Sequence, residues 1–183
     1  HSYHKNLIAF DLKNLQIKKK FLKITRNQDF LISIGHKTKK KVIYLDSDEE
    51  GFLTSKGEHN LGKKISKTVV EILELFESKG FKIFIKKHGR AKLSLSFPRR
   101  KNWTYISDFI PIELYKLKES DFLIGYTTSG LSLVFQNNPE VQSISIVKMI
   151  PSKIFNFDYV KANYKKFNKS NKVQYPNSIQ EIK

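Results

Sequence analysis

The sequence has 183 residues, with 34 Lys and Arg against 17 Asp and Glu, so its formal net charge is +17 at pH 7. It has no cysteine, which excludes a disulfide framework and a thiolate metal site. No apolar run approaches the roughly 18 residues that span a bilayer. A hydrophobic share of 39% is enough for the core of one compact domain, with or without appendages.

The positive charge favours anionic partners: nucleic acid, acidic lipid and anionic polysaccharide all qualify. Base composition of the gene explains the charge equally well, because Lys, Ile, Asn and Phe share A/T-rich codons. The only methionine is Met149, and no methionine opens the chain. We therefore expect a piece of a longer protein, in which a missing N-terminal domain is one partner.

Three parts of the chain are expected from its composition. Residues 1–40 read as a connector or as the remnant of a preceding domain, with short strands at Leu7–Phe10 and Phe30–Ile34 between basic runs. Residues 41–168 alternate strand and helix patterns and form the domain proper. Residues 169–183 read as a polar C-terminal tail.

The first half of the domain predicts a βαβ unit. Lys41–Leu45 is a β-branched and aromatic strand, and Phe81–Ile85 is the next one. Between them, Leu61–Lys79 has apolar residues at the i, i+3, i+4 spacing of a helix with one buried face. Asn60 is a candidate N-cap, and Gly80 stands where a helix C′ glycine belongs.

The second half continues the alternation, and the whole order reads β-α-β-β-α-β-α-β-α. This pattern predicts an α/β fold with a doubly wound, mostly parallel, Rossmann-like sheet. The expected strands are Trp103–Ile106, Phe122–Ile124 and Val141–Val147. The expected helices are Pro111–Lys118, one that begins with Leu131–Phe135 and is ended by Asn138–Pro139, and Phe157–Phe167, with a last turn at Ser178–Ile182.

A cationic cluster follows the strand Phe81–Ile85 in the segment KKHGR, which contains Lys86, His88 and Arg90. In an open α/β sheet, ligands bind beyond the carboxyl ends of the strands. There, a histidine can donate to a phosphate oxygen or give its proton to a departing phosphate. The alternative is a solvated basic loop, which is common in a chain so rich in lysine.

A hydroxyl-rich turn follows the strand Phe122–Ile124. Thr127, Thr128, Ser129 and Gly130 lead into a predicted helix, where hydroxyls and free backbone N–H groups suit a phosphate. The alternative is an ordinary helix N-cap, since Ser and Thr are preferred there for local reasons.

Two acidic features have weaker signals. Glu113, two residues after Pro111, can accept hydrogen bonds from ribose hydroxyls, although a carboxylate near a helix N-terminus is also simply favourable. The acidic loop Asp46–Glu50 lacks the spacing of a calcium loop, and we expect it to be solvated. Neither a GxGxxG motif nor a GxxxxGK[ST] motif occurs in the sequence.

Three segments taken together, KKHGR, DFIPIEL and SDFLIGYTTSGL, lie within roughly residues 41–150 and carry a family resemblance. In order and spacing they resemble the C-terminal, nucleotide-binding half of bacterial sialyltransferases with two Rossmann-like domains, a GT-B-type architecture. That group includes capsular polysialyltransferases and lipooligosaccharide sialyltransferases. Gly89 stands where the family has proline. Wall-polymer glycerophosphotransferases are similar in layout.

The resemblance implies a glycosyltransferase that moves a sugar from a CMP-activated donor, such as CMP-sialic acid, to a surface glycan, without a metal or other cofactor. His88 would act as general acid at the donor phosphate, which Thr128 and Ser129 would hold. Glu113 would bind the ribose, and the backbone near Ile110–Ile112 would meet the base. The remaining donor-binding residues would be Lys86, Arg90, Pro111, Thr127 and Gly130.

The missing half would bring the glycan acceptor and the catalytic base, so we expect the isolated chain to be inactive. The family's base is an acidic pair before glycine. Glu49-Glu50-Gly51 matches those letters, but it follows the first strand of this half, and we interpret the match as a coincidence. The expected location is the cytoplasm, in part on the inner membrane face. The alternative function is a non-enzymatic basic module that binds nucleic acid or another polyanion.

Overall fold

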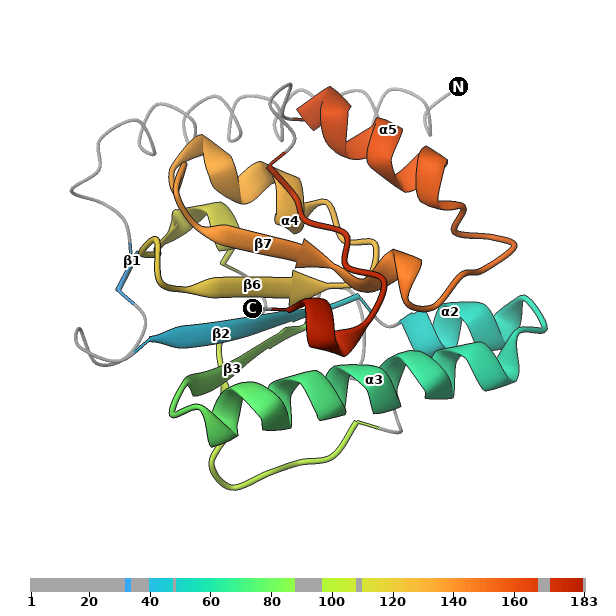
Figure 1. The fold of residues 1–183 in the computed structure, drawn as a ribbon, viewed down its shortest axis with the longest axis horizontal. Helices are drawn as coiled ribbons and strands as arrows, with labels where there is room; N and C mark the ends of the chain where they lie inside the picture. Colours follow the sequence, from blue (N-terminus) through green and yellow to red (C-terminus); the bar gives the residue numbers. More distant parts are fainter. Residues whose placement is uncertain are drawn as a thin grey trace, which may run out of the picture.

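A parallel five-stranded β-sheet forms the centre of the computed structural model (Figure 1). The structure describes residues 32–33, 40–47, 49–87, 97–107, 110–167 and 172–182. The strand order is β4-β3-β2-β6-β7, and every neighbouring pair is parallel. The strands are β2 (Lys41–Asp46), β3 (Lys82–Lys87), β4 (Thr104–Tyr105), β6 (Phe122–Gly125) and β7 (Gln142–Ser145). This order confirms the predicted α/β, doubly wound sheet.

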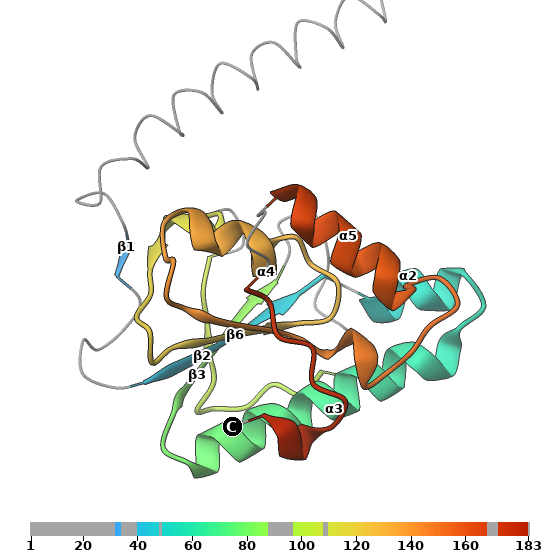
Figure 2. The same cartoon turned by 45° about the horizontal axis from the view of Figure 1, so that its top comes forward.

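Helices cover both faces of this sheet. The long helix α3 lies on one face, whereas α4 and α5 lie on the other, and α2 lies beyond the carboxyl ends of the strands (Figures 1 and 2). The central strands are therefore buried on both sides, as near-continuous apolar runs in parallel sheets usually are. The helices are α2 (Glu49–Ser55), α3 (His59–Ser78), α4 (Gly130–Leu133) and α5 (Phe157–Phe167), with 3₁₀ turns η2 (Ile112–Leu114), η3 (Val134–Gln136), η4 (Ile146–Lys148) and η5 (Ile179–Glu181).

Helix α3 has the apolar face that its sequence predicts. Its buried residues include Ile65, Val69 and Phe76, one turn or two apart. Gly80 has a φ of +83° and follows the C-cap Lys79, which confirms it as the C′ glycine. The predicted N-cap is wrong, because Asn60 lies inside the helix, which begins at His59 after Glu58.

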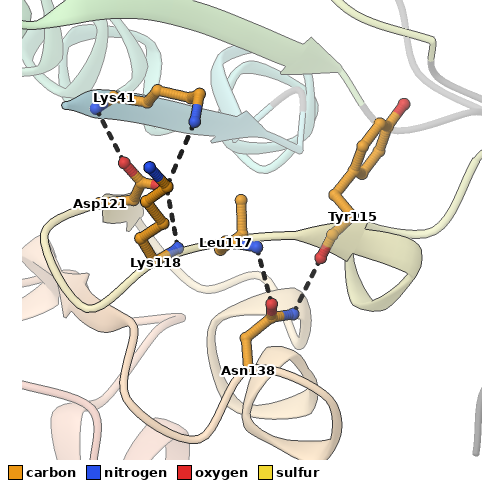
Figure 3. Close-up of polar contacts among 6 residues, drawn as sticks. All are labelled: Lys41, Tyr115, Leu117, Lys118, Asp121 and Asn138. Atoms are coloured by element: carbon orange, nitrogen blue, oxygen red, sulfur yellow. Dashed lines mark hydrogen bonds and ion pairs between the residues drawn. The ribbon is translucent and has the colours of Figure 1, made fainter. Parts of the chain in front are cut away.

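The helix predicted at Pro111–Lys118 is much shorter in the structure. One 3₁₀ turn, η2, is followed by the strand β5 (Tyr115–Lys116), which pairs in parallel with β1 (Ile32–Ser33). The buried side chain of Asn138 explains the change, because it accepts from Leu117 N at 2.8 Å and donates to Tyr115 O at 3.0 Å (Figure 3). These bonds take backbone groups that a longer helix needs.

A buried ion pair fixes the amino ends of β2 and β6. The Asp121 carboxylate lies 3.6 Å from Lys41 Nζ, and their side chains are 0% and 5% exposed. The same carboxylate accepts from the backbone N–H groups of Lys41 at 3.0 Å and Lys118 at 2.9 Å (Figure 3). Asp121 therefore binds the backbone of Lys118, three positions before it, and both the backbone and the side chain of Lys41, 80 positions before it.

One residue of the predicted tail, Gln174, pairs with the edge strand β7. Gln174 donates to Ser143 O at 2.8 Å and accepts from Ser145 N at 2.9 Å, so it pairs with β7. Unpaired strand edges invite aggregation, and this pairing covers one. The predicted last turn appears as η5. The predicted strand Phe30–Ile34 contains β1, whereas the one predicted at Leu7–Phe10 lies outside the described residues.

None of the helices in the described segments is long and apolar enough to cross a membrane.

Candidate functional site

The strand order creates a topological switch point between β2 and β6. From β2 the chain passes to β3, which lies on one side of β2, and it later returns to β6, which lies on the other side of β2. Helix α3 follows β2 over one face, whereas α4 follows β6 over the opposite face (Figure 1). In α/β proteins, loops that depart to opposite faces at such a point leave room for a ligand at the carboxyl ends of the strands.

Two of the sequence-predicted motifs meet at this switch point. A Cβ on Gly130 would lie 2.9 Å from Leu45 Cδ1 and 3.0 Å from Ile112 Cγ2, so the turn after β6 packs tightly on β2 and on η2. A methyl group at this position would require the side chain of Leu45 or Ile112 to shift. The carbonyl of Glu113 accepts from Asn137 Nδ2 at 2.9 Å, which holds η2 against the end of η3. The Pro111–Glu113 segment and the hydroxyl turn are therefore neighbours.

The hydroxyl turn offers side chains rather than helix N–H groups. Helix α4 has only four residues, and the N–H groups of Leu131, Ser132 and Leu133 already donate to the carbonyls of Thr128 and Ser129. The dipole of so short a helix is small. The N-cap Ser129 makes no side-chain capping hydrogen bond and is exposed. The Ser129 hydroxyl therefore does not cap the helix, which was the alternative interpretation of this residue.

The cationic cluster after β3 is described only in part. Lys86 is 8% exposed, and its Nζ donates to the carbonyl of Ser107 at 3.1 Å, which ties the end of β3 to the segment after β4. Lys87, half-buried, pairs in register with Asp46 of β2. His88 and Arg90 lie outside the described residues. Of the predicted base-contacting residues, Ile110 is half-buried and Pro111 is exposed.

Two residues of the acidic loop are buried, although the sequence predicts a solvated loop. Asp46 is 2% exposed and Glu49 is 3% exposed, so the expectation of a solvated loop is wrong for these two residues. Asp46 ends β2 and accepts from Tyr44 Oη at 3.2 Å, whereas Glu49 begins α2 and accepts from Ser47 N at 3.2 Å. Asp48 lies outside the described residues. The sequence signal that could have predicted their burial is their position at the end of the strand Lys41–Leu45, which is the central strand of the sheet.

The environment of Glu49 changes its acidity. Burial raises the pKa of Glu49 to about 7, and the nearby charge of Asp46 contributes to the rise. The backbone N–H groups of Glu49, Ser47 and Thr127 lower the pKa, but not enough to offset burial. Because Thr127 belongs to the hydroxyl turn, the Glu49 carboxyl lies near that turn. A carboxyl that titrates near neutrality in such a place is typical of a functional site.

In the segments described, no three His, Cys, Asp or Glu side chains gather as ligands for a metal ion. Models of known protein families give no match to this chain, and a search among curated proteins gives none either.

Proposed function

We propose that the carboxyl edge of the sheet binds a cytidine nucleotide sugar, and that the chain is the donor-binding half of a sialyltransferase-like glycosyltransferase. The observation that carries the proposal is the packing of Gly130 against both Leu45 and Ile112. It brings the end of β2, the Pro111–Glu113 segment and the hydroxyl turn to one place, the switch point at which α/β folds bind nucleotides. The resemblance of the three sequence segments supplies the donor class.

The roles follow from the chemistry of a nucleotide monophosphate ester. The hydroxyls of Thr127, Thr128 and Ser129 donate to phosphate oxygens, and the Glu113 carboxylate accepts from the ribose hydroxyls. His88 directly follows β3 and would give its proton to the departing phosphate. In the transfer step, the bond between the anomeric carbon and the phosphate oxygen breaks, and an acceptor hydroxyl oxygen bonds to that carbon. The acceptor proton goes to a base on the other half of the enzyme.

Electrostatic stabilisation of the leaving phosphate is the main contribution expected from this half. The positive charge of the chain suits that task, and it also suits an anionic glycan acceptor or an anionic membrane surface, where each basic residue contributes about 1 kcal/mol.

Calorimetric titration of the chain with CMP, CDP and UMP at moderate salt tests the proposal. We expect selective binding of CMP that weakens at least about tenfold in Glu113→Ala, since a ribose held by two hydrogen bonds to a carboxylate loses more than about 1.4 kcal/mol. Glu119→Ala is the matched control, because Glu119 is exposed and lies in a separate pocket with Lys40 and Phe122. Absence of CMP binding, or equal affinity in both variants and the wild type, contradicts the proposal.

A second candidate is a polyanion-binding module. The observation behind it is the net charge of +17, together with exposed lysines on the helices of both sheet faces: Lys63, Lys64 and Lys67 on α3, and Lys165 and Lys166 on α5. Such binding falls steeply with salt and is indifferent to the base. It also predicts that His88→Ala weakens binding no more than loss of any one lysine. Tight binding of a short oligonucleotide without preference among mononucleotides would favour this candidate.

A further inference from the structure

Glu49 has an unsatisfied carboxyl oxygen in the interior of the carboxyl edge. Its Oε1 is buried and has no hydrogen-bond partner within the described part of the chain, and the same holds for Ser47 Oγ beside it. Buried polar atoms are nearly always hydrogen-bonded, so two orphans in one loop need an explanation. Ser47 lies between β2 and α2, and Glu49 is the first residue of α2, so both are near the switch point.

The hydrogen bonds that are present decide where a proton on Glu49 sits. Glu49 Oε2 accepts from Ser47 N at 3.2 Å, and a backbone N–H can only donate. The neutral carboxylic acid therefore carries its proton on Oε1, the orphaned atom. A buried O–H without an acceptor costs about 1–3 kcal/mol, so the neutral acid leaves one donor to be satisfied by something else.

The surroundings favour the neutral acid. Among the described residues, the titratable groups that interact electrostatically with Glu49 include Asp46 and Tyr44 on β2, Tyr126 after β6 and Tyr164 on α5. The cations Lys86 and Lys87 end the adjoining strand β3, in register with Leu45 and Asp46. The first four groups are acids or phenols, so none of them offers a positive charge to an ionised carboxylate. The raised pKa of Glu49 agrees with this geometry.

The carboxyl also lies beside the hydroxyl turn, since the backbone N–H of Thr127 acts on it directly. We propose that Glu49 is a ligand-binding residue that donates a hydrogen bond from Oε1 to a phosphate oxygen held at the turn of Thr127, Thr128 and Ser129. This assignment rests on the proposed function, because it names a further contact to the same phosphate. A phosphate repels an ionised carboxylate, so the anion binds the protein in which Glu49 is protonated.

The assignment fixes the direction of the pH dependence. With a free-protein pKa near 7, the protonated fraction of Glu49 falls from about nine-tenths at pH 6 to about one-tenth at pH 8. Affinity scales with the competent fraction, so CMP affinity should fall about tenfold over this range. If the group at Oε1 were instead a hydroxyl donor, the ionised form would be needed, and affinity would rise with pH.

The experiment is calorimetric titration of the full chain with CMP at pH 6 and pH 8, for the wild type, Glu49→Gln, Glu49→Ala and the control Glu119→Gln. Glutamine keeps one donor and one acceptor without the charge. We expect Glu49→Gln to bind CMP about tenfold more tightly than the wild type at pH 8, and about equally at pH 6. Glu49→Ala should bind more weakly than Glu49→Gln at both pH values. The phosphate of CMP itself titrates near pH 6, but this contribution is common to all variants.

The outcomes separate this inference from the proposed function. Parallel pH profiles for the wild type and Glu49→Gln, with CMP bound by both, would overturn the role of Glu49 and leave the nucleotide site intact. Tighter binding by the wild type than by Glu49→Gln at pH 8 would overturn it as well. Failure of CMP to bind any variant at either pH would overturn both proposals. Circular dichroism and thermal melts establish that each variant is folded.

Discussion

Replacing Glu49 by glutamine should change how the stability of this fold depends on pH. The pKa of Glu49 is raised from 4.5 to about 7 in the folded protein, chiefly by burial and then by the charge of Asp46. In the unfolded chain the carboxyl returns to its ordinary pKa of about 4.3. The folded state therefore binds more protons than the unfolded state between these two values. Its stability with respect to this group is full below the unfolded pKa and is lost as the pH rises through the folded pKa.

The size of the effect follows from the same two values. At about 1.4 kcal/mol for each tenfold change in acidity, the complete loss, reached above pH 7, is about 4 kcal/mol. About 2 to 3 kcal/mol of it falls between pH 5 and pH 8. Glutamine does not titrate, so the free energy of unfolding of Glu49→Gln, minus that of the wild type, should increase by this amount over the same range. The offset at any one pH includes altered hydrogen bonds, but the change with pH does not.

Urea denaturation of both proteins at pH 5, 6, 7 and 8, followed by circular dichroism, measures this difference. Glu119→Gln, which replaces an exposed carboxylate, should follow the wild type across the range. A constant difference between Glu49→Gln and the wild type would refute the reasoning. It would mean that the carboxyl ionises as easily in the folded protein as in the unfolded chain, and the basis for its protonated role at the phosphate would then be lost.

Two further substitutions test the packing that positions the site. Asp121→Ala leaves the buried Lys41 without its charge partner, so it should lower the free energy of unfolding, measured in urea, by about 3–5 kcal/mol. The control Glu140→Ala removes one partner of a surface ion pair and should lower the free energy of unfolding by less than about 1 kcal/mol. Equal losses would contradict a buried pair. Gly130→Ala places a methyl 2.9 Å from Leu45 Cδ1, so it should lower the free energy of unfolding by about 1–3 kcal/mol, seen as a lower melting temperature, and it should weaken CMP binding. An unchanged melting temperature would show that the turn has room for the methyl group.

Local patterns in the sequence were sufficient for the sheet and for its main helix. Strands such as β2 are continuous apolar runs, and α3 has its apolar residues at helical spacing, because each element must bury one side or both. The alternation of these patterns gave the doubly wound architecture. Gly80 was identified because a helix C′ position in the left-handed region is one that glycine fills without steric cost.

Other features depended on groups that are far apart in the chain. The side chain of Asn138, more than 20 positions later, binds the backbone of Tyr115 and Leu117, so η2 and β5 form in place of the helix predicted at Pro111–Lys118. No local sequence pattern predicts those hydrogen bonds. The tail pairs with β7 through Gln174, which belongs to a segment that reads as polar. Gly130 was chosen from sequence for its place in a turn, but the structure adds that it packs on β2 and η2 at once.

The sequence by itself determined which segments are strands and helices, and it marked the hydroxyl turn and Glu113 as candidate binding residues. Only the tertiary structure decided that Asp46 and Glu49 are buried and that Glu49 lies against Thr127. Periodicity is a property of neighbouring residues, so it can be read locally. The burial of a carboxylate, and with it the pKa, depends on which distant strand ends beside it, and that is set by the order of strands in the sheet.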